Sequence, residues 1–199
     1  IDLYQVHQVD PLTPMEETLR TLDDLVRSGK VRYIGLSNHP AWMVVNAQET
    51  ARRCNLNAFV SCQDEYSLLI RDADRELMPM MSRYGIGLLP YFPLACGLLT
   101  GKYSRNNMPA GARLTENKRW QDKYLNDRNW RVTEALDAFA RKRGHTLLDL
   151  AFSWLLARPN VGSVIAGATS PAQVEANVKA ASWKLGADDL AEIDRITTG

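Results

Sequence analysis

The chain has 199 residues, with 24 Lys and Arg against 23 Asp and Glu, 45% hydrophobic residues and a net charge of +1. That length suits one sizeable core and is short for two, so we expect a single globular domain over residues 1–199. The balanced charge argues against a nucleic-acid partner, and the longest apolar stretch, at 85–99, is too short and too often interrupted by Gly and Pro to span a membrane.

The cysteines and the first residue carry two further expectations. Cys54, Cys62 and Cys96 are an odd number without a CxxC spacing, which disfavours a disulfide framework or a zinc site and favours a reducing cytoplasm. Ile1 lies inside an apolar run and is not a Met, so we expect that residues upstream of it are missing from this sequence.

Short apolar segments rich in β-formers alternate with helical patterns along the chain. In the first helix, Thr13 and Glu16 are predicted to form a Thr-x-x-Glu capping box around Pro14, and Gly29 ends the helical pattern. We predict five strands, at 1–7, 31–37, 58–63, 85–92 and 161–167.

The later helices carry similar end signals. In the helix that Gly85 ends, Pro79 is expected in or near the first turn, and Thr146 with Asp149 is expected to form a second capping box. The polar segment 101–127 lacks apolar periodicity and is predicted to be a long loop. We predict helices over 40–54, 128–143, 146–158 and 187–197. Two further helices are predicted, one that follows Pro171 and a short one that Gly85 ends.

Strands that alternate with helices indicate an α/β fold with a parallel sheet, either open and doubly wound or closed as a (β/α)8 TIM barrel. The GxGxxG that usually follows the first strand of a doubly wound dinucleotide-binding fold is absent. Polar residues instead gather where the predicted strands end, which is where barrel active sites are built. Because a barrel needs eight strands, we expect this chain to cover about the last five β/α units, with about three absent.

Several of these strand-end residues have chemistry that suits a site. His7 can act as a general acid or carbonyl donor near neutral pH, although spacing alone favours a structural His. Ser37, Asn38 and Gln63 can pair with an amide. A turn or capping role is the stronger interpretation of Ser37 and Asn38 by themselves, and Gln63 can instead be a satisfied polar residue at a strand end. Tyr91 can stack on a flat heterocycle or simply pack in the core.

Anion-binding features follow in the second half of the chain. The segment GLLTGK at 97–102 is not a P-loop, because three residues separate its glycines and Tyr103 replaces the required Ser or Thr. Lys102 and Arg113 can meet a phosphate, or remain solvated charges. At 167–171, GATSP predicts a capped helix start that suits an anion, with Gln173 and Asn177 one turn apart on that helix, or else a plain cap.

Trp120 and Trp130 lie in or beside the polar segment. They are equally suited to lining a substrate mouth and to packing a loop onto the barrel.

These residues, in this order, resemble the aldo-keto reductase family over essentially the whole chain. KVRYIGLSN at 30–38 closely matches a family signature, and IDLYQVH at 1–7 resembles the strand that delivers the catalytic His. Further blocks match at 62–69, 91–103 and 167–178, and PLACG with GKY is most similar to the branch that includes potassium-channel β subunits and bacterial relatives.

The resemblance implies an NADP(H)-dependent oxidoreductase without a metal, acting on a small carbonyl substrate. His7 would be catalytic and orient the carbonyl, while Ser37, Asn38 and Gln63 would hold the nicotinamide carboxamide. Tyr91 would stack on the nicotinamide ring. The pyrophosphate would follow Phe92, Pro93, Leu94, Ala95 and Cys96, and the adenosine 2′-phosphate and adenine would meet Lys102, Arg113, Gly167, Thr169, Gln173 and Asn177.

The chain departs from the family pattern at three positions. Phe92 stands where many members have a Ser that bonds the pyrophosphate, and Ala176 where many have a Glu that contacts adenine. Gln173 stands where many others use Arg, which leaves the choice between NADP and NAD open. The resemblance also places the catalytic Tyr, Lys and Asp upstream of Ile1.

Three functional hypotheses follow from these residues. The first is an enzyme that reduces aldehydes or ketones to alcohols by direct hydride transfer. The second is a regulatory or binding subunit that senses NADP(H) with little turnover. The third is a catalytically silent partial barrel or one that pairs with another chain, such as a second copy of itself; its open strand edges would be prone to aggregation.

Overall fold

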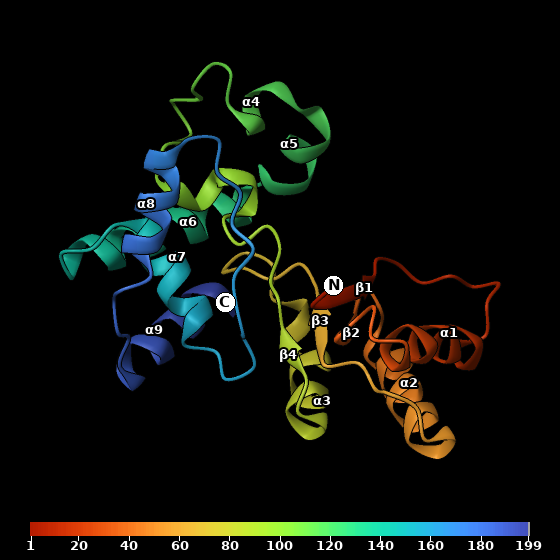
Figure 1. The fold of residues 1–199 in the computed structure, drawn as a ribbon. Coiled ribbons are helices and arrows are strands. Elements are labelled where there is room, and N and C mark those ends of the chain that lie inside the picture. The colour runs from red at the N-terminus through yellow and green to blue at the C-terminus, as the bar shows by residue number, and fades with distance from the viewer. Residues whose placement is uncertain (199) are drawn as a thin grey trace. The chain divides into compact units, whose positions relative to one another are not determined.

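A computed structural model describes residues 1–198, which fold into two compact units (Figure 1). The first unit contains residues 1–65, 72–89 and 160–163, and the second contains 66–71, 90–159 and the chain from 164 onward. Within the described residues, no helix is long and apolar enough to cross a membrane.

The first unit is built on a parallel sheet of four strands in the order β1-β2-β3-β4. The strands are β1 (Leu3–Val6), β2 (Tyr33–Ser37), β3 (Ser61–Gln63) and β4 (Gly87–Leu88). Leu36 is in register with Cys62, which is in register with Leu88, and all three side chains are fully buried. The sheet therefore confirms the predicted α/β class with parallel strands.

The fifth predicted strand, 161–167, is wrong as a strand. Only Val161 forms a bridge, to Leu88, although Ile165 also donates its N–H to the carbonyl of Pro90. The fourth strand is likewise shorter than the predicted 85–92, because Pro90 has no N–H to give to a ladder.

The helices of the first unit are α1 (Met15–Arg27), α2 (Ala41–Cys54) and α3 (Leu77–Tyr84), with the short η1 (Asp72–Asp74). Figure 1 shows α1 and α2 side by side. The predicted capping box at the start of α1 is wrong: Pro14 is the N-cap, and the Thr13 hydroxyl donates instead to Asp10. Pro79 lies in the first turn of α3, and Gly85 follows its last residue in a left-handed conformation, as predicted.

The second unit is helical. It contains η2 (Ala95–Thr100), α4 (Arg113–Glu116), α5 (Lys118–Tyr124), α6 (Asp127–Lys142), α7 (Leu147–Leu156), α8 (Pro171–Ala180) and α9 (Ala187–Thr198). The prediction of a continuous loop over 101–127 is wrong, because α4 and α5 lie inside it. Leu114 and Tyr124 anchor these two helices with fully buried side chains, and Asn117 caps the start of α5.

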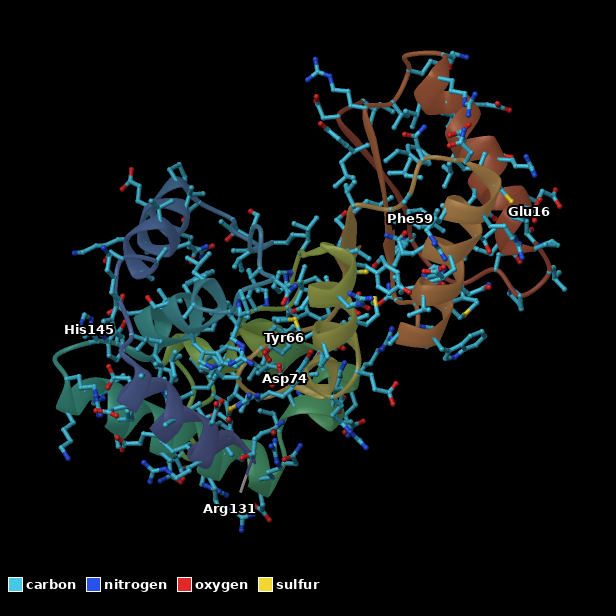
Figure 2. All side chains as sticks on the ribbon, turned by 90° about the horizontal axis from the view of Figure 1, so that it is seen from below. Glu16, Phe59, Tyr66, Asp74, Arg131 and His145 are labelled. Carbon is cyan, nitrogen blue, oxygen red and sulfur yellow. The ribbon has the colours of Figure 1, made fainter. Side chains whose placement is uncertain are left out.

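The core of the second unit surrounds α7, whose side chains are apolar along almost its whole length. Trp154 is fully buried, with its ring 5.1 Å from the ring of Tyr66. Figure 2 shows Tyr66 inside this unit and His145 at its edge. The predicted capping box is present, since the Thr146 hydroxyl accepts from the Asp149 N–H and the Asp149 carboxylate accepts from the Thr146 N–H.

Candidate functional site

The carboxyl ends of β1, β2 and β3 bring together a connected set of amides and a hydroxyl in the first unit. The Asn38 side-chain amide donates to the His7 carbonyl over 3.0 Å and to the Ser37 hydroxyl over 2.9 Å. The Ser37 hydroxyl donates in turn to the Gln63 carbonyl over 2.6 Å. Four of the residues singled out in the sequence are therefore joined by hydrogen bonds.

Gly35 makes this arrangement possible. A Cβ at Gly35 would lie 2.4 Å from the Ser61 hydroxyl and 3.2 Å from the Gln5 side chain, so any larger residue in the middle of β2 would force these side chains to move. The Gln5 side chain passes through this space and donates from its amide to Oε1 of Gln63. The Gln63 amide is thereby oriented, and its Nε2 donates to no other described residue.

Asn38 adopts a left-handed backbone conformation with φ of 58°. Asn tolerates this conformation better than most residues because its short polar side chain bonds locally. The turn that follows β2 therefore fixes where the Asn38 amide lies.

Asp64 directly follows Gln63 and is a polar residue that sequence reasoning missed. Its Oδ2 is buried and has no hydrogen-bond partner in the described chain. Burial raises the pKa of Asp64 to about 6, against the opposing effect of a hydrogen bond from the Asn38 backbone. The sequence did contain a signal for Asp64, because its carboxyl group directly follows a strand-end residue that was already predicted to contact a ligand.

The other titratable side chains of this region differ in exposure. The His7 side chain is exposed, and its imidazole forms no hydrogen bond to a described residue, so it is accessible to a substrate. His39 is buried, with Nδ1 2.8 Å from the Ser37 carbonyl. Burial, followed by the effect of Asp64, raises the pKa of Cys62 to about 12, so this thiol stays neutral.

In the second unit, the segment from Tyr91 to Gly97 forms a tight loop with unusual backbone geometry. Phe92, Ala95 and Cys96 all have positive φ, at 51°, 46° and 56°. Positive φ values are unfavourable for residues other than glycine, and such strained residues are concentrated at ligand-binding loops. The loop is closed by N–H donation from Ala95 to the Phe92 carbonyl over 2.9 Å and from Gly97 to the Leu94 carbonyl over 2.8 Å.

Phe92 belongs to a chain of aromatic contacts in this unit. Its ring lies edge-on 5.2 Å from Tyr91 and 5.0 Å from Trp120, and the Trp120 ring lies 6.2 Å from the buried Tyr124. Phe92 therefore packs against α5, where a Ser would leave a hydroxyl for a ligand. Trp120 is a half-buried residue of this cluster and not part of an irregular loop.

Two cations lie near this loop without acidic partners. Lys102 Nζ lies 5.0 Å from the Tyr103 ring, over the space that a side chain at Gly97 would fill. Neither Lys102 nor Arg113, the first residue of α4, forms an ion pair within residues 1–198. Uncompensated cations of this kind suit an anionic ligand.

The start of α8 is organised as predicted. The Ser170 hydroxyl accepts from the Gln173 N–H over 3.3 Å, and Pro171 is the first helical residue. The Gln173 side chain folds back and accepts from the Thr169 N–H over 2.7 Å. Gly167 and Thr169 are exposed, and Asn177 lines an apolar cavity of about 290 Å³ between α7 and α8.

The predicted residues thus fall into one set per unit. His7, Ser37, Asn38 and Gln63 lie in the first unit, and all the residues from Tyr91 to Asn177 lie in the second. Among the residues that the structure describes, no group of three or more His, Cys, Asp or Glu side chains is arranged to hold a metal ion.

Comparison with known proteins gives consistent matches along the chain. It is 37% identical over 183 residues to a probable voltage-gated potassium channel subunit beta of Oryza sativa subsp. japonica, covering 90% of this chain and 56% of that protein. It is 36% identical to probable aldo-keto reductase 1 of Glycine max, covering 97% and 54%. It is 34% identical to L-glyceraldehyde 3-phosphate reductase of Escherichia coli K12, covering 98% and 58%.

The chain spans just over half the length of these relatives. A model of the Aldo/keto reductase family matches residues 1–198. Its parallel sheet and helices form part of the (β/α)8 barrel of that family. The chain belongs to the aldo/keto reductase family.

Proposed function

We propose that the chain functions in an NADP(H)-dependent oxidoreductase that reduces small aldehydes or ketones to alcohols. The observation that carries the proposal is the hydrogen-bonded set of His7, Ser37, Asn38 and Gln63 at the ends of three parallel strands. Oxidoreductases among the relatives support the same class of reaction.

Three features of the structure fit a nicotinamide dinucleotide phosphate. Gln63 offers an oriented amide whose Nε2 still has a hydrogen bond to give, which matches a carboxamide oxygen. Lys102 and Arg113 carry charges that no described carboxylate neutralises, which matches a phosphate. The strained backbone from Phe92 to Cys96 matches a loop shaped for close approach of a ligand.

The residues of this chain would act by holding and orienting. Asn38, Ser37 and Gln63 would hold the carboxamide, and Tyr91 would support one face of the nicotinamide ring. The chemistry that such a cofactor would supply is a hydride for the carbonyl carbon. His7 would bind the carbonyl oxygen through its exposed imidazole and help a proton reach that oxygen as the hydride arrives.

Cofactor binding is the first test. Titration of the chain with NADPH and NADH, followed by nucleotide fluorescence, should show tighter binding of NADPH. Lys102→Ala should weaken the binding of NADPH at least tenfold and leave the binding of NADH nearly unchanged, because only NADPH carries the 2′-phosphate. Lys118→Ala is the matched control, since Lys118 is exposed and already paired with Asp122; an equal effect of both variants on both nucleotides would contradict the assignment.

Turnover is the second test. In a protein that also carries the catalytic Tyr, Lys and Asp expected upstream of Ile1, His7→Ala should lower kcat for an aldehyde roughly 100-fold or more while the Kd for NADPH stays the same. A parallel loss of NADPH affinity would contradict a role at the carbonyl.

A sensor of NADP(H) is the alternative function, favoured by the Oryza sativa relative that is named a probable voltage-gated potassium channel subunit beta. Its signature is tight NADPH binding with negligible oxidation of the bound cofactor by any carbonyl. Rapid oxidation by an aldehyde would favour the reductase. A cytoplasmic location remains a prediction from the cysteine content.

A further inference from the structure

Asp64 is a half-buried acid in the first unit, with one fully buried carboxyl oxygen, and the roles assigned above do not use it. It follows Gln63 at the end of β3, and the Asn38 backbone donates a hydrogen bond to its carboxyl group. Its other oxygen, Oδ2, is buried without a hydrogen-bond partner among residues 1–198. The carboxyl group therefore lies beside the segment that presents the Asn38 amide, and it is not satisfied by the protein alone.

The charges around Asp64 do not compensate it. No Lys or Arg forms an ion pair with Asp64 in the part of the chain that the structure describes. Cys62, on the same strand, stays neutral because its thiol has a pKa of about 12. Other titratable residues at this end of the sheet are Glu65, the next residue in the chain, and His7 and His39, which follow β1 and β2. When ionised, Asp64 thus adds a negative charge at this end of the sheet that no described Lys or Arg pairs with.

We propose that Asp64 sets the preference of this site between the two redox forms of its cofactor, favouring NADP+ over NADPH. The inference rests on the proposed function. The oxidised nicotinamide ring carries a positive charge and the reduced ring is neutral, while the rest of the two molecules is the same. A carboxylate that follows Gln63 and is bonded by the Asn38 backbone attracts only the oxidised ring, so it changes the ratio of the two affinities.

The expected size follows from Coulomb's law. With an effective dielectric constant of about 20, two opposite unit charges within roughly 10 Å change a dissociation constant about tenfold. Hydrogen bonds to the carboxamide and phosphates are common to both cofactor forms and cancel in the ratio. The ratio of the affinities for NADP+ and NADPH therefore reports the effect of the Asp64 charge more specifically than either affinity does.

The experiment compares Asp64→Asn with the unaltered chain at pH 8. NADPH binding is followed by nucleotide fluorescence and NADP+ binding by calorimetry. We expect Asp64→Asn to raise the Kd for NADP+ about tenfold and to change the Kd for NADPH by no more than about twofold. Asp24→Asn is the matched control, because it removes the same charge from an exposed position on α1 and should leave the ratio unchanged.

A second measurement uses pH and needs no variant. Lowering the pH from 8 to 5 protonates Asp64, so NADP+ affinity should fall relative to NADPH in the unaltered chain. The 2′-phosphate titrates in the same range but is present in both forms. A pH dependence with any other origin would persist in Asp64→Asn, whereas the effect of Asp64 would disappear.

The outcomes separate this inference from the proposed function. Binding of both forms with the same ratio in Asp64→Asn and the unaltered chain, and a ratio that does not vary with pH, would overturn the role of Asp64 and leave the reductase proposal intact. Failure of the unaltered chain to bind either form would overturn both.

Discussion

At the scale of single residues, two carboxylates of the first unit show opposite responses to burial. Asp23 is almost fully buried, yet its pKa is lowered, chiefly by the hydrogen bond from the Asn57 N–H. Asp64 lacks donors for Oδ2, and burial raises its pKa. Hydrogen bonds to the ionised form decide the direction of each shift.

Asp23 should stabilise the fold above its pKa. It accepts from the Asn57 N–H over 2.8 Å, from Asn57 Nδ2 over 2.7 Å and from Arg27. Asp23→Ala leaves these donors unpaired and should lower the free energy of unfolding at pH 7 by about 2 kcal/mol. Because its pKa is lowered in the folded state, the stabilisation is complete above the unfolded value of about 4 and is lost as the pH falls below it.

Urea unfolding followed by circular dichroism at pH 7 and pH 3 measures this effect. Asp24→Ala, on the exposed side of α1, is the control and should change stability little at either pH. A loss for Asp23→Ala that is as large at pH 3 as at pH 7 would show that the carboxylate charge is not involved.

Asp64 should show the reverse dependence. Its pKa is raised to about 6, so the folded state favours the neutral carboxyl and is destabilised as the pH rises from about 4 to above 6. Asp64→Asn removes this cost and should raise the free energy of unfolding by about 1–3 kcal/mol at pH 8. The same urea experiment at pH 4 should show almost no gain; an equal gain at both pH values would rule out ionisation as the cause.

At the scale of elements, helix ends show what a capping pattern can and cannot predict. Thr146 and Asp149 form both hydrogen bonds of a capping box at α7. At α1 the same pattern fails, because Asp10 accepts the Thr13 hydroxyl and the helix begins one residue after Pro14. At α1, the Asp10 carboxylate competes for the Thr13 hydroxyl. Asp10 lies outside the four-residue pattern, so the pattern cannot predict this outcome.

Thr146→Ala should therefore lower the free energy of unfolding by about 1 kcal/mol, through loss of the N-cap of α7. Thr13→Ala tests the other helix and should cost only a few tenths, since Thr13 does not cap α1. Urea midpoints of the two variants measure the difference. Equal losses would mean that Thr13 contributes to α1 in solution.

Most elements were predictable from periodicity and end signals, and the exceptions have physical causes. The strands at 85–92 and 161–167 have the right composition, but Pro90 interrupts the ladder and only Val161 makes a bridge. The helices α4 and α5 are polar and short, and Leu114 and Tyr124 alone give too little periodicity to detect. Tertiary packing against η2 and Tyr103 supports them.

The site shows a similar division. Residue types at strand ends indicated Ser37, Asn38 and Gln63, and the hydrogen bonds among them follow from parallel strands in register. Gln5 and Asp64 were missed because their importance depends on contacts across strands: Gln5 orients the Gln63 amide, and the Asn38 backbone bonds Asp64. Sequence spacing carries no information about such contacts.

At the scale of the whole molecule, binding of NADPH should affect both sets of candidate residues, the one in the first unit and the one in the second. At 100 times its Kd, NADPH should raise the free energy of unfolding by about 2.7 kcal/mol. Hydrogen exchange should slow at 35–38 and 61–64 in the first unit, because the amide set would be held there. It should also slow at 92–97 and 169–173 in the second, because a bound dinucleotide phosphate would cover these segments and hold them in place.

Exchange measured by mass spectrometry with NADPH, with NADH and without nucleotide resolves these segments in one experiment. NADH lacks the 2′-phosphate, so it should protect the first-unit segments as NADPH does and protect 169–173 less. Protection confined to the second unit would mean that the chain holds the phosphates without engaging the nicotinamide. That result would favour a binding subunit over a reductase, since hydride transfer requires the ring to be held where His7 can reach the carbonyl.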